Sequence, residues 1–224
     1  MIKGRIAEIF DSVQGEGIYL GEKQVFVRFF GCNLRCKFCD TKLNYFTEYA
    51  VPELFSQIQS YPRDFHSISF TGGEPLLQKD FLKEVVILTK DEGYKNYLET
   101  NGVLFNELNE IIDYLDIIAM DYKLPSSTGD LPYWMAHQRF LEIASLKEVF
   151  VKIVISNTTE TEDLLRALNL IKEVNRAVTI VLQPNSNENG FALDKKIDYY
   201  KALCEDYALA TCKIPQMHKL IGAQ

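Results

Sequence analysis

Apolar, β-branched runs alternate with segments of helical periodicity along most of the chain, and this alternation restricts the fold more than any other feature. Six runs predict β-strands, at residues 25–30, 67–70, 94–98, 117–120, 149–155 and 178–182. Five segments predict helices, at 81–89, 108–114, 134–145, 161–174 and 194–207. Such alternation favours an α/β fold with a parallel sheet and right-handed crossovers.

Six strand–helix units are too few to close an eight-stranded barrel, so we expect an open or partial (β/α)6 barrel. Segments 5–10 and 209–215 are candidates for one further strand near each end. The longest irregular stretch, 125–132, contains Ser, Thr and Gly and is interpreted as a mobile loop near the site. Without a repeat or a convincing linker, residues 1–224 are expected to form a single domain.

Charge and cysteine use narrow the class of function. The formal net charge is −7 and no long Lys/Arg run occurs, so nucleic acid is not expected as a direct substrate. The sequence predicts neither a signal peptide nor a membrane span, and we expect a soluble cytoplasmic protein. Three of the five cysteines lie within eight residues, which indicates metal ligation in a reducing compartment and not a disulfide framework.

These three cysteines, Cys32, Cys36 and Cys39, follow the first strong strand. Their spacing lets one loop wrap three corners of an iron–sulfur cubane and leaves the fourth iron open to an exogenous ligand. A structural zinc site or three unrelated buried cysteines are the alternatives, although zinc would need a fourth ligand and no histidine is near in sequence. Cys204 and Cys212 lie far away and are expected to be buried thiols.

Glycine-rich and polar segments follow four of the predicted strands. They are Gly72-Gly73-Glu74-Pro75, Glu99-Thr100-Asn101-Gly102, Asp121-Tyr122-Lys123 and Gln183-Pro184-Asn185-Ser186. The carboxyl ends of parallel strands are the edge at which α/β folds bind ligands. Taken singly, each segment has a simpler interpretation as a tight turn or a strand cap. Their shared edge favours a binding site, where glycines permit close backbone approach and either Glu74 or exposed backbone carbonyls can accept from an ammonium group.

The cysteine loop, with Phe38 in the aromatic position, resembles the radical S-adenosylmethionine (SAM) signature Cys-x-x-x-Cys-x-aromatic-Cys. The resemblance implies a 4Fe-4S cluster on Cys32, Cys36 and Cys39 and SAM chelating the open iron. It also implies that the segment Gly72, Gly73 and Glu74 contacts the amino group of SAM.

Further motifs occur in matching order along nearly the whole chain: 10–17, 27–29, 39–41, 71–78, 99–102, 183–184 and 216–219. Together they resemble the 7-carboxy-7-deazaguanine synthases. That resemblance implies a trimmed radical SAM barrel with a short N-terminal extension, acting in queuosine and 7-deazapurine biosynthesis. The implied reaction is a lyase ring contraction of 6-carboxy-5,6,7,8-tetrahydropterin to 7-carboxy-7-deazaguanine with loss of ammonia. A homodimer and an external one-electron reductant of the flavodoxin or ferredoxin type are implied as well, and neither nucleic acid nor membrane is.

The same resemblance assigns roles to individual residues. Those expected around SAM are Phe38, Cys39, Asp40, Gly102, Asp121, Tyr122, Lys123, Gln183, Pro184, Asn185 and Ser186. Those expected around the substrate are Val13, Gln14, Gly15, Glu16, Arg28, Thr100, His218 and Gln224, with Arg28 facing the substrate carboxylate. Thr41 is implied as a Mg²⁺ ligand that substrate oxygens and water complete.

Alternatives accompany these roles. Residues 14–17 also fit a flexible glycine turn, Arg28 a surface ion pair, and Thr41 a helix cap. Asp121-Tyr122-Lys123 stands where many relatives have Ser-Pro-Lys. A glycyl-radical activating enzyme would share the three-cysteine loop but act on a protein, and an electron carrier would use the cluster without SAM. The segment 14–17 favours a small-molecule substrate over a protein partner, and cleavage of SAM to 5′-deoxyadenosine would exclude the electron carrier.

Overall fold

The computed structural model describes residues 2–39, 43–188 and 190–217, and its described strands form one nine-stranded sheet. In chain order the strands are β1 (Lys3–Val13), β2 (Lys23–Phe29), β3 (Thr47–Ala50), β4 (Ser67–Gly72), β5 (Asn96–Thr100), β6 (Ile117–Asp121), β7 (Glu148–Ile155), β8 (Thr179–Pro184) and β9 (Thr211–Lys213). Their order across the sheet is β3-β1-β2-β4-β5-β6-β7-β8-β9. From β2 to β9 all neighbours are parallel, whereas β1 pairs antiparallel with β2 and β3.

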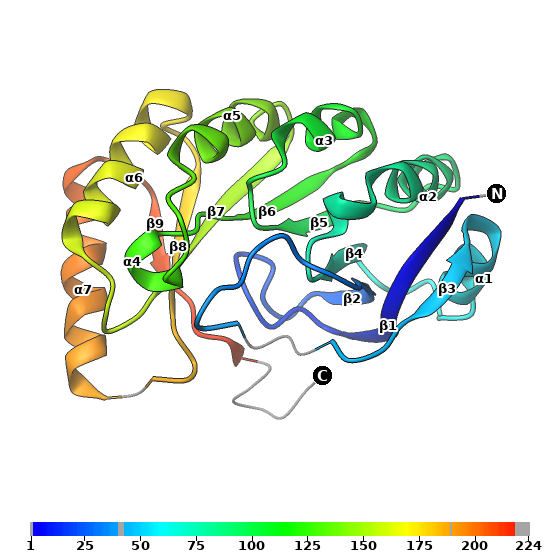
Figure 1. Cartoon of the computed structure of the whole chain (residues 1–224), viewed down its shortest axis with the longest axis horizontal. Helices are drawn as coiled ribbons and strands as arrows, with labels where there is room; N and C mark the ends of the chain where they lie inside the picture. The colour runs from blue at the N-terminus through cyan, green and yellow to red at the C-terminus, as the bar shows by residue number, and fades with distance from the viewer. Residues whose placement is uncertain (1, 40–42, 189, 218–224) are drawn as a thin grey trace.

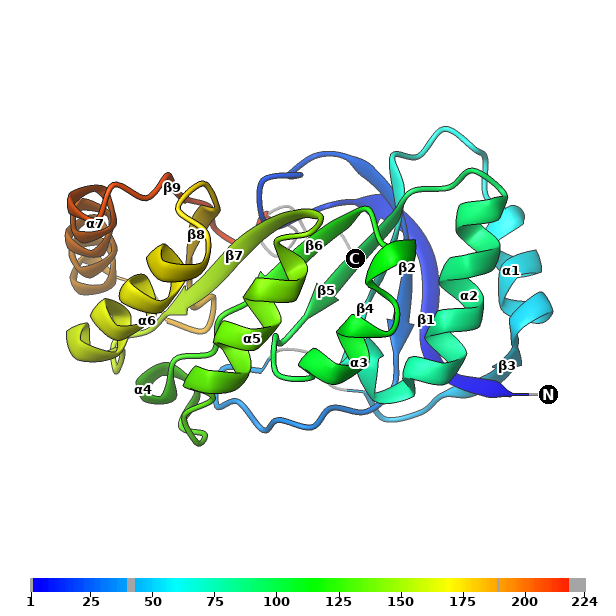
Figure 2. The same cartoon turned by 90° about the horizontal axis from the view of Figure 1, so that it is seen from above.

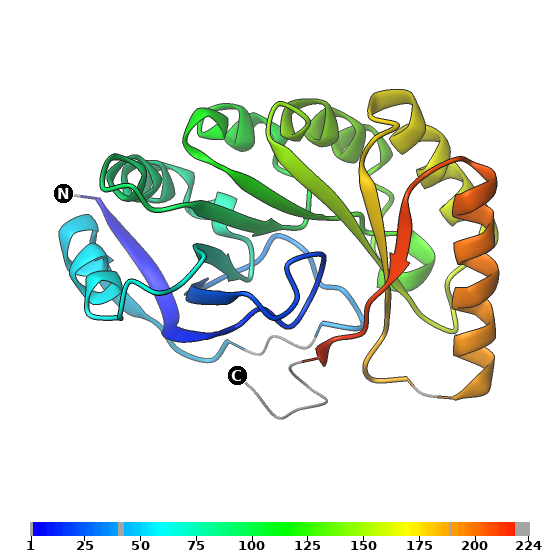
Figure 3. The ribbon, with the colours of Figure 1, turned by 180° about the vertical axis from the view of Figure 1, so that it is seen from behind.

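The helices are α1 (Val51–Gln59), α2 (Lys79–Asp91), α3 (Phe105–Asn109), α4 (Pro125–Thr128), α5 (Trp134–Ala144), α6 (Thr161–Val174) and α7 (Phe191–Asp206), with 3₁₀ turns η1 (Pro75–Gln78) and η2 (Ile112–Tyr114). Helices α2, α3, α5, α6 and α7 form an arc along the outer side of the curved sheet (Figures 1 and 2). The two edge strands of the sheet, β3 and β9, do not pair with each other, so the described strands form an open sheet (Figures 1 and 3). An open, partial barrel is therefore confirmed.

The main hydrophobic core fills the layer between the sheet and the outer helices. Leu82 and Val86 of α2 and Leu168 of α6 are fully buried there, as are strand residues such as Ile118 and Ile180. Burying both faces of parallel strands explains why these strands appear in the sequence as almost continuous apolar runs. Among the described residues no helix is long and apolar enough to cross a membrane.

A second, smaller core closes the inner side of the barrel at the amino ends of the strands. Tyr97 of β5, Ile117 and Ala119 of β6, Phe150 of β7 and Val181 of β8 meet there. Side chains two residues apart on a strand face the same side, so the next inward positions along these strands belong to the opposite, carboxyl end. That end is where the polar residues lie.

The structure differs from the sequence-based expectation in three segments. Residues 108–114 are not one helix, because α3 ends at Asn109 and a 3₁₀ turn follows. The first half of the stretch 125–132 is the short helix α4, whose Ser127 and Thr128 are buried, and only its second half is irregular as predicted. Strand β3 and helix α1 were not predicted; Glu53 of α1 accepts a hydrogen bond from the Ala50 backbone at 2.7 Å and caps the helix start.

Candidate active site

The carboxyl ends of the parallel strands surround a cavity of about 450 Å³. Its inner wall consists of the inward residues that follow the small apolar core, two positions further along each strand. They are Glu99 after Tyr97, Asp121 after Ala119, Lys152 after Phe150, and Gln183 after Val181. The period of two thus converts apolar strands into a polar-walled pocket at one end.

Most of the predicted site residues do line this cavity: Val13, Gln14, Gly15, Glu16, Arg28, Cys32, Cys36, Phe38, Cys39, Gly72, Gly73, Thr100, Asp121, Lys123, Gln183, Asn185 and Ser186. Asp40, Thr41, His218 and Gln224 lie outside the described residues. Glu74, Gly102, Tyr122 and Pro184 are described but do not line the cavity.

Tyr122 was predicted to line the cavity because it belongs to the Asp121-Tyr122-Lys123 motif, and the alternation of side chains along a strand explains why it does not. Asp121 and Lys123 face the cavity, so Tyr122 between them faces the outer helices, where it is 1% exposed. Its ring lies 4.3 Å from that of His137 on α5. Gly102 also turns toward this layer, because a Cβ on it would lie 3.1 Å from His137 Cδ2. A motif of consecutive residues cannot place all its members on one side of a strand.

The two glycines of the Gly72-Gly73-Glu74 segment hold the end of β4 against the start of the cysteine loop. Gly73 N donates to Phe29 O at 3.0 Å, and Glu74 N donates to Gly31 O at 2.8 Å. A Cβ on Gly73 would lie 2.0 Å from Gly31 O, and one on Gly72 would lie 2.4 Å from Phe29 O. Only glycine permits this approach, so the segment fixes where the cysteine loop begins.

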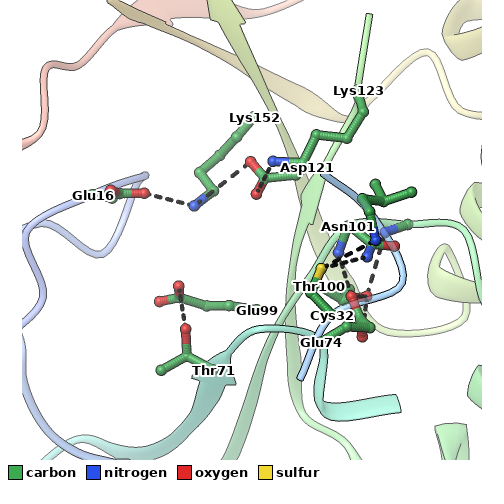
Figure 4. Close-up of polar contacts among 12 residues, drawn as sticks. Glu16, Cys32, Thr71, Glu74, Glu99, Thr100, Asn101, Asp121, Lys123 and Lys152 are labelled. Atoms are coloured by element: carbon green, nitrogen blue, oxygen red, sulfur yellow. Dashed lines mark hydrogen bonds and ion pairs between the residues drawn. The ribbon is translucent and has the colours of Figure 1, made fainter. Parts of the chain in front are cut away.

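Glu74 is buried within the fold and organises the end of β5. Its carboxylate accepts from Thr100 Oγ1 at 3.0 Å, Asn101 N at 2.7 Å and Leu76 N at 3.1 Å (Figure 4). Burial raises the pKa of Glu74 to about 7, although the donors around it act in the opposite direction. The Glu74 side chain therefore does not face the cavity, where a ligand's ammonium group would lie. It lies behind Thr100 and supports that residue instead.

The cysteine loop presents three free thiols to the cavity. Burial raises the pKa of Cys36 to about 11; Lys123 acts in the opposite direction, whereas the charges of Asp121, Cys32 and Cys39 add to the rise. Thiolates clustered this way are unfavourable unless a cation binds them. Three thiols of one loop, at the edge of a cavity with room beside them, fit three corners of an iron–sulfur cluster.

A chain of alternating charges crosses the cavity from residue 16 to residue 123 (Figure 4). Lys152 Nζ lies 2.7 Å from Glu16 Oε2 and 3.8 Å from Asp121 Oδ1, and Asp121 Oδ2 lies 2.9 Å from Lys123 Nζ. Burial disfavours the charge of Lys152, but its carboxylate neighbours outweigh this and hold its pKa well above the ordinary value. Lys152 is 4% exposed and was not predicted as a site residue.

The loop after β1 is fixed from several directions. Gln14 Nε2 donates to Glu99 Oε1 at 2.8 Å and to Gln24 Oε1 at 2.9 Å, and Gln14 Oε1 accepts from Glu16 N. Gln216 Nε2 near the C-terminus donates to Glu16 Oε1 at 2.5 Å. These hydrogen bonds hold residues 14–16 in place and bring the loop after β1 together with residue 216 at the cavity.

Arg28 and Glu99 occupy the wall beside this loop. Arg28 Nε lies 2.8 Å from Glu8 Oε2, and the guanidinium lies over the Phe10 ring. Glu99 accepts from Thr71 Oγ1 at 3.0 Å. The alternative of an ion pair for Arg28 is thus observed, but at the cavity wall and not on the outer surface.

Glu99, Asn101 and Lys152 line the cavity although none was predicted as a site residue. Glu99 and Asn101 belong to the Glu99-Thr100-Asn101-Gly102 motif, of which only Thr100 and Gly102 were predicted as site residues. Lys152 could have been found as the single charged residue inside the apolar run 149–155, because the alternation of side chains along the strand makes it point inward.

Comparison with known proteins agrees with this geometry. The family model of the radical SAM superfamily matches residues 26–193. The fold resembles the crystal structure of QueE from Escherichia coli, with a TM-score of 0.67 at 19% identity, covering 94% of this chain and 93% of that one. It also resembles SuiB from Streptococcus suis bound to S-adenosylmethionine, with a TM-score of 0.58 at 15% identity, covering 81% of this chain and 48% of that one.

Proteins related in sequence identify a narrower family. The 7-carboxy-7-deazaguanine synthase of Geobacter sulfurreducens is 35% identical, covering 97% of this chain and 96% of the relative. That of Methanothermobacter thermautotrophicus is 32% identical, covering 99% and 98%. The matched region contains the three cysteines and every strand end that lines the cavity from β2 to β8. The chain therefore belongs to the radical SAM superfamily and, within it, to the family of 7-carboxy-7-deazaguanine synthases.

Proposed function

We propose that the cavity catalyses the ring contraction of 6-carboxy-5,6,7,8-tetrahydropterin to 7-carboxy-7-deazaguanine, with loss of ammonia, as a step of queuosine and 7-deazapurine biosynthesis. The observation that carries the proposal is the meeting of the cysteine loop, the β1–β2 loop and five strand ends in one polar cavity. The chain is also similar over nearly its whole length to proteins named 7-carboxy-7-deazaguanine synthase.

Cys32, Cys36 and Cys39 would hold the 4Fe-4S cluster, and Phe38 and Lys123 lie next to it, with Lys123 Nζ 5.2 Å from the Phe38 ring centroid. When bound, the cluster and SAM supply the one-electron reductive cleavage that starts radical chemistry on the substrate. The chain's own part is to hold both molecules in contact and to exclude water. Gly72, Gly73, Asp121, Gln183, Asn185 and Ser186 would line the SAM side.

The substrate would lie between the β1–β2 loop and β5. Gln14, Glu99 and Thr100 offer donors and acceptors to the amide and amino groups of a pterin ring. Arg28 would face the carboxylate, since a guanidinium can bind a planar carboxylate through two parallel hydrogen bonds. Gln216 and the loop at residue 16 would limit water access from the open side, because they are joined at 2.5 Å.

Several parts of the proposal rest on the family resemblance alone. Thr41 would contribute to a Mg²⁺ site completed by substrate oxygens and water. His218 and the carboxylate of Gln224 would approach the substrate. We also propose a homodimer, a cytoplasmic location, and a flavodoxin or ferredoxin as reductant, since an exposed three-cysteine cluster requires a reducing compartment.

The test is an anaerobic assay of the full chain with reconstituted cluster, SAM, reductant, Mg²⁺ and the carboxytetrahydropterin. We expect the mass of 7-carboxy-7-deazaguanine to appear together with 5′-deoxyadenosine. An Arg28→Lys variant should raise KM more than it lowers kcat, because it retains the charge but loses the bidentate geometry. Enzyme that cleaves SAM but forms no deazaguanine product would reject the proposed substrate. A glycyl radical formed in an added partner protein would favour the activating-enzyme alternative.

A further inference from the structure

Asn101 is a buried polar residue of the cavity wall to which the proposed reaction gives no role. It follows β5, is 5% exposed, and directs its side-chain amide at the first cluster cysteine (Figure 4). Its Nδ2 lies 2.7 Å from Asn33 Oδ1 and 3.9 Å from Cys32 Sγ. An amide nitrogen carries two hydrogens, so it can donate to both atoms at once.

The orientation of this amide is determined by its other contacts. Asn101 Oδ1 accepts a hydrogen bond from Val103 N at 3.1 Å. If the amide were flipped, its NH₂ group would face the Val103 N–H, and two donors would meet without an acceptor. The amide nitrogen must therefore face the cysteine loop. The Asn101 backbone is held as well, because its N–H donates to Glu74 at 2.7 Å and its carbonyl accepts from His137 Nε2 at 3.1 Å.

The sulfur of Cys32 lies where two N–H groups converge. Leu34 N donates to Cys32 Sγ at 3.4 Å, and Asn101 Nδ2 approaches the same atom from another strand. As a cluster ligand Cys32 is a thiolate, which only accepts hydrogen bonds. Cluster binding therefore strengthens both contacts, because hydrogen bonds to a charged acceptor are stronger than those to a neutral one.

We propose that Asn101 is a positioning residue for the cluster: it donates a hydrogen bond to the Cys32 thiolate, fixes that corner, and raises the reduction potential. The reduced cluster carries one more negative charge than the oxidised cluster. A donor aimed at a ligand sulfur stabilises the more negative form, and hydrogen bonds to the sulfurs are among the factors that set cluster potentials. The proposal rests on the cluster being bound at Cys32, Cys36 and Cys39.

The experiment compares two neutral variants of the full-length, anaerobically reconstituted protein. Asn101→Leu removes both polar atoms with little change in volume. Asn101→Ser keeps an oxygen that can accept from Val103 N, because serine forms the same local turn as asparagine, but its side chain is too short to reach Cys32. Asn106→Leu, on the exposed side of α3, is the matched control. The readout is a redox titration with dithionite followed by the EPR signal of the reduced cluster, without SAM or substrate.

Loss of one hydrogen bond should lower the reduced-to-oxidised ratio at a fixed potential about three- to tenfold in both Asn101 variants. The Asn106→Leu variant should match the wild type. If Asn101 serves only to hold the turn, Asn101→Ser titrates like the wild type, and the proposal is overturned. Should Asn101→Leu fail to retain its cluster, the titration of Asn101→Ser decides alone.

Failure of this proposal is distinguishable from failure of the proposed function. The potential is measured without turnover, so an inactive enzyme with a normal cluster still gives a result. A wild-type chain that shows no cluster signal at all would instead remove the basis of the proposed function.

Discussion

Lys152→Met tests whether the charge chain across the cavity, from Glu16 through Lys152 to Asp121, stabilises the fold. The substitution preserves most of the side-chain volume and removes the cation between Glu16 and Asp121. Removing one partner of a buried pair costs about 3–5 kcal/mol, because the other charge stays buried without compensation. Here Glu16 keeps Gln216 and Asp121 keeps Lys123, and the two carboxylate side chains are 14% and 23% exposed. We therefore expect a smaller loss, of about 2–3 kcal/mol.

The assay is anaerobic thermal unfolding at one scan rate, with equal iron content in all samples. For a chain of this size about 1 kcal/mol corresponds to a shift of about 2–4 °C, so Lys152→Met should lower Tm by about 5–10 °C. Lys3→Met is the matched control, since Lys3 and Glu48 form an ion pair at 3.6 Å in which both side chains are more than half exposed. It should shift Tm by less than about 2 °C.

A double variant separates the pair from simple packing. Glu16→Gln together with Lys152→Met removes the uncompensated charge at residue 16, so its Tm should lie above the value expected from adding the two single effects. The reasoning is refuted if Lys152→Met is as stable as Lys3→Met, or if the two single effects add without coupling.

Three further outcomes are expected. The pKa of Glu74 is raised to about 7, so the stability that its protonated form contributes is present below the ordinary value of 4.5 and is lost as pH rises through 7. Between pH 5 and pH 8 the wild type should therefore lose Tm relative to Glu74→Gln, which stays neutral. Gly73→Ala places a Cβ 2.0 Å from Gly31 O, so reconstituted iron content should fall by about half or more, and normal iron would show that the loop tolerates displacement. Cys36→Ala should lose the cluster whereas Cys204→Ala and Cys212→Ala retain it, as iron and sulfide analysis will check; loss in either control would implicate a second site.

The parallel strands were predictable because both their faces are buried. Each of the six central strands appears as a short, almost continuous apolar run, and the structure places a strand at each of them. Strand β3 carries no such run, since the sequence Thr47-Glu48-Tyr49-Ala50 lies at the sheet edge and exposes Thr47 and Glu48. Edge strands need not be apolar, and this explains why β3 was missed.

The site was predictable to the extent that its motifs stand at strand ends. The cysteine loop, the glycines after β4 and the polar residues after β6 and β8 all reach the same cavity. Within a motif, however, the strand period decides which members face it. Tyr122 was assigned by adjacency to Asp121 and Lys123 and faces the helices instead. Lys152 was overlooked because a single charge in an apolar run forms no motif, although its inward position follows from Phe150 two residues earlier.

Buried support behind the cavity could not be predicted from spacing at all. Glu74 connects three segments that are far apart in sequence, since its backbone N–H donates to Gly31 O and its carboxylate accepts from Thr100 and Asn101. The cluster loop and the β5 end are therefore both bonded to Glu74, the first through its backbone N–H and the second through its carboxylate. Burial raises the pKa of Cys32 and the charge of the Glu74 carboxylate adds to the rise, so a change of the Glu74 side chain should disturb both the cluster and the substrate side. Asn101, by contrast, reaches the cluster ligand directly. Measuring the cluster potential and the substrate KM in the same variants would separate the two: Asn101→Ser should move the first alone, whereas Glu74→Gln should move both.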